Sequence, residues 1–426
     1  MLLISVFILS LLAIINYGVS KKAILYPPVV FCATWAASIF IIWVFQSVFY
    51  PMLPETLAFF LCGALAFSAG AWAATMTSSL RPSRQAVTPV FQKSVTRTIT
   101  VLLLVVIVGT PIYFYWLFHL TLGSALTFLQ ATRNKSIELM GQDTTFTLFG
   151  TLGELSFMVA MLAFFERNNH PRRSTIAIIF ALIMSISTGS KAGPLSIIVA
   201  LVVIYWIKAR RIQWKILLTT FIFSIIVAGL INFYSHFGGG SFSETLPSVV
   251  DAFPLYSSGG LVAFDRVVRD PHIVPHFDQL VVTVLRIARK LGASDIEIHE
   301  NAEFVSIGPQ EFFQDNVYTM YWSYLDMGYA GSITVAGIIG FIVTWVYHRA
   351  IKGHRISIML YATLLYGVFF STFTEYFSGR LYFFSKLCLL TWVVYYFPAR
   401  WKQFRRFTGA VVSSDMAASS ACRLSQ

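Results

Sequence analysis

Apolar stretches long enough to cross a bilayer recur along this chain, and they limit its fold more than any other feature. A helix needs about 20 apolar residues to span the hydrocarbon core. About eleven spans are predicted, several of them short, at roughly 2–18, 24–46, 56–77, 98–119, 146–165, 174–189, 192–207, 215–235, 328–347, 356–372 and 380–397. Only 12% of the residues are charged, whereas a soluble domain carries about 25%. The sequence therefore predicts an all-α polytopic membrane protein.

The predicted spans divide the chain into four regions. Transmembrane helices 1–8 are expected in residues 1–235, and one long, partly helical polar loop follows at 236–327. Transmembrane helices 9–11 are expected in residues 328–397, and a Ser/Ala-rich tail occupies 398–426. The first span lacks a basic N-terminal region and a small-residue cleavage site, so we expect a retained helix rather than a signal peptide.

Lysine and arginine residues are distributed unequally over the connections. Of the 31 basic residues, 21 fall in one set of connections and in the tail, where only Glu166 and Asp415 of the 19 acidic residues occur. Short cytoplasmic loops are enriched in Lys and Arg. This asymmetry predicts a cytoplasmic C-terminus, an N-terminus on the opposite side and a long loop outside the cytoplasm. Because the net charge of +12 follows this pattern, no nucleic-acid partner is expected.

Several basic residues stand on the outer side, where the positive-inside trend disfavours them. Arg133 follows the fourth span, Lys191 lies in the tight turn STGSKAGP, and Arg380 begins the last span. A turn with exposed amides beside a cation and a helix N-terminus is suited to binding an anion. For Lys191 the alternative is a plain turn whose lysine reaches toward the interface.

The long loop adds further cations. Arg266 and Arg269 are one turn apart in FDRVVRDPH, and Arg286 and Arg289 share one face of an amphipathic helix predicted at 280–291. This helix either lies on the membrane with its cations at lipid headgroups or clamps an anionic substrate with its guanidinium groups.

Two histidines of the loop have a spacing that would suit zinc if both stood on one helix. His272 and His276 are four residues apart, but Pro271 and Pro275 interrupt any helix there. The spacings of the four cysteines match no metal motif, and no metal site is expected. One of the histidines could instead accept a proton near neutral pH.

Carboxylates and an intramembrane lysine complete the candidates. Glu311 and Asp315 lie among many aromatic residues at the end of the loop, which suits an interfacial belt or a surface on which sugars stack. Lys386 lies inside the last predicted span. A lysine there faces a cavity or pairs with a carboxylate, and Glu154 is such a carboxylate.

Three features of the chain together resemble the O-antigen polymerase (Wzy) family of bacterial inner membranes. They are the STGSKAGPL turn between two short helices, the single long outer loop, and the NVYTMYWSYLDMGYAGS run that enters the next helix. The topology extends the resemblance over nearly the whole chain and implies a GT-C-like architecture. It also implies an inverting, metal-independent glycosyltransferase that uses neither a nucleotide sugar nor another cofactor.

The resemblance further implies a substrate and a site. Undecaprenyl-pyrophosphate-linked glycan would be both donor and acceptor at the periplasmic face, and a chain-length regulator protein (Wzz-like) would be a partner beside membrane lipids. Asp315, Glu311 or His272 would deprotonate the acceptor hydroxyl. The residues expected to hold pyrophosphate and glycan are Arg133, Lys191, Arg266, Arg269, Arg286, Arg289 and Arg380.

Two alternatives remain open at the level of sequence. An O-antigen ligase shares the helices, the long loop and the basic residues, but it transfers to a lipid A core sugar. A lipid-linked oligosaccharide flippase or another secondary transporter typically has repeated halves and charges buried in mid-membrane. No internal repeat is detected in this chain.

Overall fold

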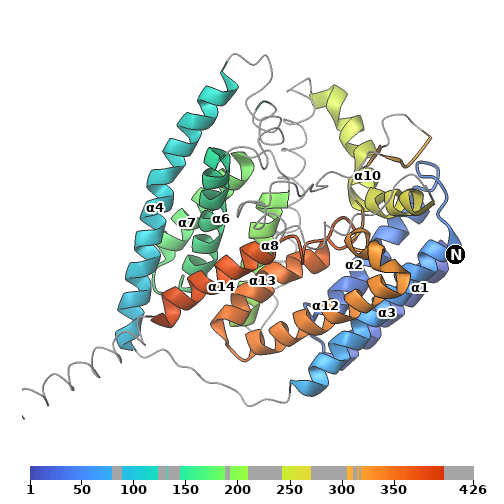
Figure 1. Cartoon of the computed structure of the whole chain (residues 1–426), viewed down its shortest axis with the longest axis horizontal. Helices are drawn as coiled ribbons and strands as arrows, with labels where there is room; N and C mark the ends of the chain where they lie inside the picture. Colours follow the sequence, from blue (N-terminus) through green and yellow to red (C-terminus); the bar gives the residue numbers. More distant parts are fainter. Residues whose placement is uncertain are drawn as a thin grey trace, which may run out of the picture.

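The computed structural model describes residues 1–78, 89–122, 131, 144–187, 192–209, 242–269, 305–309, 314–315 and 318–397. These residues form long helices and one small hairpin (Figure 1). The helices are α1 (Leu2–Val19), α2 (Pro27–Val44), α3 (Pro54–Thr77), α4 (Pro89–Thr121), α6 (Thr144–Phe165), α7 (Pro171–Ser187), α8 (Ala192–Ala209), α10 (Phe242–Arg269), η1 (Trp322–Met327), α12 (Gly328–Ile351), α13 (Arg355–Phe369) and α14 (Leu381–Tyr395). The hairpin pairs β1 (Val305–Ser306) with β2 (Gln314–Asp315).

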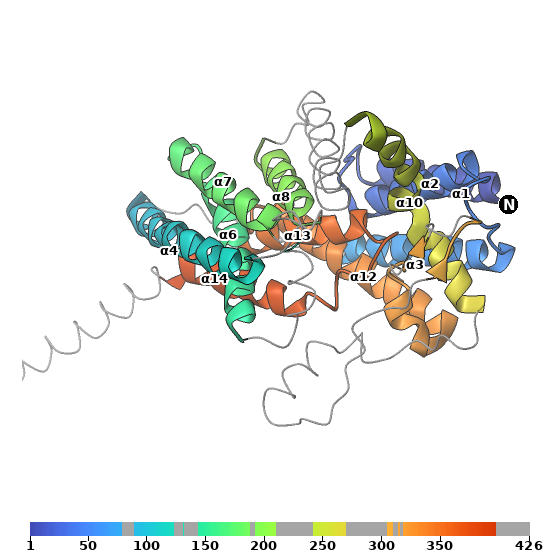
Figure 2. The same ribbon diagram turned by 90° about the horizontal axis from the view of Figure 1, so that it is seen from above.

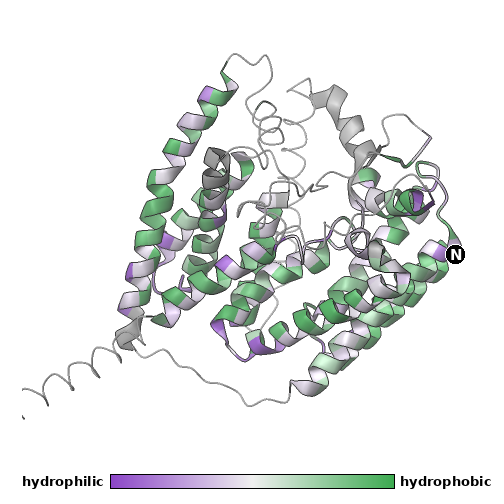
Figure 3. Cartoon of the chain, in the orientation of Figure 1, coloured by the Kyte–Doolittle hydropathy of each residue, from purple (hydrophilic) through white to green (hydrophobic). Residues whose placement is uncertain are grey.

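Five of the described helices are long and apolar enough to cross a membrane: α1, α2, α3, the Lys93–Thr121 part of α4, and α12. Shorter apolar helices are found at Gly150–Phe165, Gly193–Ala209, Arg355–Phe369 and Leu381–Tyr395. Figure 3 shows apolar residues along most of the length of the helices. The predicted all-α membrane class is therefore confirmed. The predicted span at 215–235 and the tail at 398–426 lie outside the described residues.

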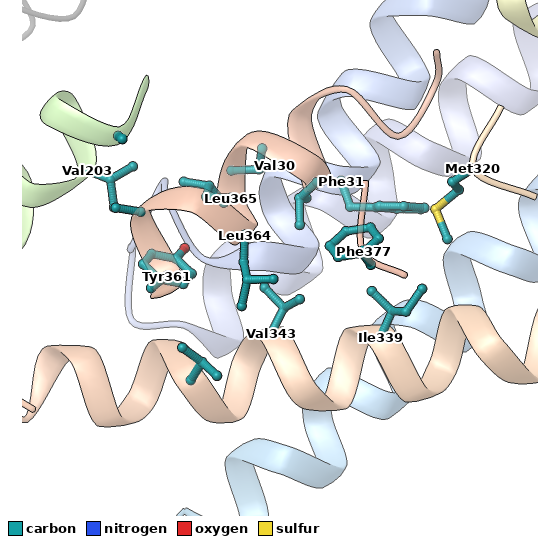
Figure 4. Packing of buried hydrophobic residues seen from close by; sticks show 14 of the residues in the cluster. Val30, Phe31, Val203, Met320, Ile339, Val343, Tyr361, Leu364, Leu365 and Phe377 are labelled. Atoms are coloured by element: carbon teal, nitrogen blue, oxygen red, sulfur yellow. The ribbon is translucent and has the colours of Figure 1, made fainter. Parts of the chain in front are cut away.

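The helices gather in two groups joined by α13. Seen from above, α1, α2, α3, α10 and α12 lie on one side, and α4, α6, α7, α8 and α14 lie on the other (Figure 2). Helix α13 contacts α2 and α12 in the first group and α8 and α14 in the second. Most of its residues are buried, and many of these are apolar. Figure 4 shows Leu364 and the neighbouring Phe377 near Ile339 and Val343 of α12.

Glycines allow α3 and α12 to pack backbone against backbone. A Cβ atom on Gly70 would lie 1.9 Å from the carbonyl oxygen of Gly337, and one on Gly340 would lie 2.2 Å from that of Phe67. Membrane helices commonly associate through small residues, because lipid supplies no hydrophobic force between them. A buried polar contact also joins α1 to α3, because the side-chain amide of Asn16 donates to the Ser68 hydroxyl at 3.0 Å.

The two ends of the bundle differ in the contacts that hold them. At one end, here called the basic end and found in the lower part of Figure 1, Lys352 donates to the Ser78 carbonyl at 2.6 Å, and Arg173 donates to Thr100 at 3.0 Å. The opposite end, here called the loop end, carries α10, the hairpin and residues 370–380. There the Met320 amide donates to the Ser371 carbonyl at 2.9 Å.

Within the predicted long loop, α10 is the largest described element, and its final turns are built into the bundle. Leu261, Val262, Ala263 and Phe264 are fully buried, and the Phe264 ring stacks on Phe59 of α3 with centroids 5.8 Å apart. The part of the loop that the structure describes therefore includes an integral piece of the helical core.

Candidate functional site

A tight turn between α13 and α14 is organised by one carboxylate at the loop end. Oε1 of Glu375 accepts hydrogen bonds from the Tyr324 hydroxyl at 2.6 Å and from the amides of Phe377 and Ser378 at 2.6 and 2.7 Å. Oε2 accepts from the Ser378 hydroxyl at 2.8 Å and the Gly379 amide at 3.0 Å. Five donors on one carboxylate fix the path of the chain into α14.

Tyr324 links this turn to the segment that enters α12. Burial, and then the charge of Glu375, raise the pKa of the Tyr324 phenol above its usual range. The phenol is therefore protonated and donates the hydrogen bond to Glu375. The Glu375 carboxylate thus accepts hydrogen bonds from both Tyr324 and residues 377–379.

The consequence of this turn is a fixed position for Arg380, which is the N-cap residue of α14. Its guanidinium lies 4.0 Å from the centroid of the Tyr376 ring, a cation–π contact. Arg380 and Tyr376 line a cavity of about 10 Å³, room for about one water molecule, beside Ser196 of α8 and Thr363 and Tyr366 of α13. Its remaining lining is aromatic, from Phe157, Phe383 and Phe384.

One and a half turns farther along α14, a second cation is held by a carboxylate. Nζ of Lys386 lies 2.6 Å from Oε2 of Glu154 on α6 and 3.9 Å from the centroid of the Tyr382 ring. The predicted pairing of Lys386 with Glu154 is confirmed. Because its charge is neutralised by Glu154, Lys386 differs from Arg380, whose described contact is with an aromatic face.

A separate cluster fastens α10 to the chain that enters α3. Asp265 is fully buried, and its Oδ1 accepts from the Leu53 amide at 3.1 Å and from the Thr56 hydroxyl at 2.5 Å. Its Oδ2 forms an ion pair with Arg269. Arg269 also donates to the Pro51 carbonyl at 2.9 Å. Asp265 therefore acts as a clamp between α10 and the start of α3, which lies more than 200 residues earlier in the sequence.

Arg266 lies on the outside of this clamp. Its side chain is exposed, and its guanidinium lies 4.9 Å from the centroid of the Tyr50 ring. The Tyr50 amide in turn donates to the Ile307 carbonyl beside β1 at 2.9 Å. Of the two neighbouring arginines, Arg266 contacts an aromatic ring, whereas the guanidinium of Arg269 is held by protein oxygens.

The predicted site residues fall into three sets. The first set is described at the loop end and consists of Arg266, Arg269 and Arg380. Arg266 and Arg269 lie on α10, whereas Arg380 lies at the start of α14 against Tyr376. Asp315 belongs to β2, where its backbone pairs with Val305. The predicted residues outside the described part of the chain are Arg133, Lys191, His272, Arg286, Arg289 and Glu311.

Two residues that organise the site were not predicted in their roles. Asp265 stands four residues before Arg269, a spacing that brings opposite charges together on a helix, so its pairing with Arg269 could have been predicted. Tyr324 and its bond to Glu375 leave no such signal, because the two residues belong to different elements. Among the described residues, no group of three or more His, Cys, Asp or Glu side chains is placed to hold a metal ion.

Comparison of the chain with protein-family models, with curated proteins and with solved structures finds no match.

Proposed function

We propose that this protein is a membrane glycosyltransferase that polymerises undecaprenyl-pyrophosphate-linked oligosaccharide units at the outer face of a bacterial inner membrane. The observation that carries the proposal is the Glu375 turn, which holds Arg380 at the N-terminus of α14 with its guanidinium on the Tyr376 ring. Helix N-termini and guanidinium groups both favour phosphate oxygens.

The proposed reaction moves the growing glycan from one carrier lipid to another. A hydroxyl at the non-reducing end of the incoming unit attacks the anomeric carbon of the donor, and the bond from that carbon to the pyrophosphate oxygen breaks with inversion. The proton of the hydroxyl passes to a base, for which Asp315, Glu311 and His272 are the candidates. Undecaprenyl pyrophosphate leaves, and cations compensate its developing charge. No metal is required by this scheme.

The described arginines support different parts of this scheme. Arg380 places a guanidinium at a helix N-terminus and is assigned to the pyrophosphate. Arg266 is exposed and is assigned to the glycan or to its phosphates. Arg269 already binds Asp265 and Pro51, so we assign it to holding α10 in place. Arg133, Lys191, Arg286 and Arg289 are proposed to complete the cradle.

The test is the fate of lipid-linked units in the host bacterium. Arg380→Ala and Arg289→Ala should each abolish long polymer while single repeat units still accumulate on the carrier lipid. Arg380→Lys should retain part of the activity, because it keeps the charge but loses the bidentate geometry. Arg172→Ala removes an exposed arginine at the basic end and should leave the polymer unchanged. Normal long polymer from both alanine variants would overturn the assignment.

A transporter of lipid-linked oligosaccharide is the second candidate, because the pair of Glu154 and Lys386 places opposite charges on two apolar helices. Removing the whole protein separates the candidates. Loss of a polymerase leaves single units on carrier lipid at the outer face. Loss of a flippase leaves them facing the cytoplasm, and loss of a ligase leaves finished polymer on the carrier.

A further inference from the structure

A basic groove lies between α4 and the beginning of α7, at the end of the bundle opposite the candidate site. It has a volume of about 640 Å³, within the roughly 300–1,000 Å³ of small-ligand sites. Three cations line it, Lys93 and Arg97 from α4 and Arg173 from α7. Hydroxyl, amide and imidazole groups fill the rest of the wall, from Thr96, Thr100, Asn169 and His170.

Two contacts across the groove hold its walls together. Arg173 donates from its guanidinium to the Thr100 hydroxyl at 3.0 Å, and the Thr96 hydroxyl lies 3.3 Å from Nε2 of His170. Both contacts join α4 to the first turn of α7 or the residue before it. The walls of the groove are therefore fixed relative to each other, as a binding site requires.

The charges of the α4 wall are exposed and available. Lys93 and Arg97 are both exposed, and neither forms a hydrogen bond or an ion pair with any residue in the described part of the chain. No carboxylate is among the described residues that line the groove. Behind the lining residue Asn169 lies Glu166, whose oxygens accept from the Tyr395 hydroxyl at 3.1 Å and from Asn169 at 3.3 Å. The groove thus concentrates positive charge that its own walls do not neutralise.

An exposed apolar stripe leads away from Arg97 along the same helix. Val101, Leu104 and Val108 follow Arg97 at helical spacings of four, three and four residues, and they are 54%, 53% and 62% exposed. Residues at these spacings share one face of a helix. They belong to the part of α4 that is long and apolar enough to span a membrane, so a lipid acyl chain would have a continuous surface above the groove.

We propose that this groove binds the phosphate of an anionic phospholipid, whose acyl chain lies along Val101, Leu104 and Val108. Lys93 and Arg97 would pair with the phosphate oxygens, and Thr96 would donate a hydrogen bond to the headgroup. A soluble phosphate compound would use the same cations but would gain nothing from the stripe. The combination of cations that have no described hydrogen-bond or ion-pair partner with an adjoining exposed apolar stripe therefore favours the lipid. This inference does not depend on the proposed function.

The experiment compares lipid retention by the full-length protein purified in detergent. Native mass spectrometry would follow titrations with dioleoyl phosphatidylglycerol and with dioleoyl phosphatidylcholine, whose acyl chains are the same. The variant is Lys93→Gln with Arg97→Gln, and the charge-matched control is Lys21→Gln with Lys22→Gln, at the α1–α2 turn of the same end. We expect the groove variant to bind phosphatidylglycerol roughly tenfold more weakly, whereas the control binds like the wild type.

Competition distinguishes the lipid from a soluble ligand. Glycerophosphoglycerol carries the same phosphodiester headgroup without acyl chains, and it should displace phosphatidylglycerol only at a large molar excess. Displacement at equal concentrations would overturn the lipid assignment in favour of a soluble phosphate ligand. Equal retention of phosphatidylglycerol by the wild type and the groove variant would overturn the site itself, because the cations would then serve membrane orientation alone.

Discussion

At the scale of single residues, Glu375 is the side chain on which the geometry of the candidate site depends most. Glu375→Gln keeps the size of the side chain but replaces one acceptor oxygen with an NH₂ group that faces amide and hydroxyl donors. Hydrogen bonds to a charged group contribute about 1.5–3 kcal/mol each, so we expect a loss of about 2 kcal/mol. The melting temperature of the purified protein should fall, and long polymer should be lost with it.

The matched control for this substitution is Glu55→Gln. Glu55 is an exposed acid in the first turn of α3, also at the loop end. Its substitution removes the same charge but leaves the hydrogen bonds of Glu375 intact. It should leave both the melting temperature and the polymer close to wild type. If the two variants behaved alike, the Glu375 network would not determine the position of Arg380.

The ion pair between Lys386 and Glu154 gives a second prediction at this scale. Lys386→Met leaves the Glu154 carboxylate alone in an apolar setting, and we expect a loss of about 2 kcal/mol. Adding Glu154→Gln should restore most of that loss, because no unpaired charge remains. Thermal unfolding of the two single variants and the double variant measures the coupling. Additive effects of the two changes would show that the pair contributes nothing to stability.

Local spacing explains which of these residues could be predicted from sequence. Arg266 and Arg269 stand out as cations on the outer side, and Asp265 could have been added from its spacing to Arg269. The partners of Asp265 on the other side, Leu53 and Thr56, are more than 200 residues away. No spacing rule connects them, so the burial of this carboxylate follows only from the tertiary fold.

At the scale of elements, the crossing of α3 and α12 is the contact most sensitive to added volume. Gly70→Ala would place a Cβ atom 1.9 Å from the Gly337 carbonyl oxygen, and neither backbone can yield without moving a whole helix. Overpacking of this kind costs about 1–3 kcal/mol. We expect a lower melting temperature and a larger fraction of aggregated protein in size-exclusion chromatography.

Gly150→Ala is the control for helix propensity. Gly150 belongs to α6, and a Cβ atom there would meet no other atom within 4 Å. Since alanine favours a helix over glycine by about 1 kcal/mol, this variant should be as stable as the wild type or more so. A Gly70→Ala variant with an unchanged melting temperature would refute close packing of the two backbones.

The elements themselves differ in how far the sequence determines them. Apolar runs such as that of α1 are visible without any tertiary information, because lipid alone requires them. Helix α10 is different, since Gly259 and Gly260 interrupt its apolar residues just before the buried run Leu261–Phe264. Its helical form there is stabilised by packing on α2 and α3, which the sequence does not reveal.

At the scale of the whole molecule, the two ends of the bundle present different chemistry. The loop end combines cations with carboxylates, as at Arg269 with Asp265 and at the Glu375 turn. The basic end has a groove with three cations and no carboxylate in its lining. In our proposals, the loop end binds the pyrophosphate-linked glycan and the basic end binds an anionic phospholipid. The two ligands would then not compete for one site. The proposed polymerisation also requires the loop end to face outward and the basic end to face the cytoplasm, as the positive-inside rule predicts.

The orientation can be tested by labelling single cysteines with a maleimide that does not cross membranes. Asn168→Cys marks the basic end, Pro309→Cys marks the loop end, and both positions are exposed. We expect Pro309→Cys to react in cells whose inner membrane is intact, and Asn168→Cys to react only after that membrane is permeabilised.

The background for this labelling needs Cys422→Ser, because Cys422 lies in the tail that is expected in the cytoplasm. Cys32 is buried, and Cys62 and Cys388 lie among apolar residues within α3 and α14, so none of the three should react with a reagent confined to water. The unsubstituted background protein reports any remaining labelling. The reverse pattern, with Asn168→Cys reacting in intact cells, would place the basic groove outside. The loop end would then face the cytoplasm, and the candidate site would not lie on the side where the proposed polymerisation takes place.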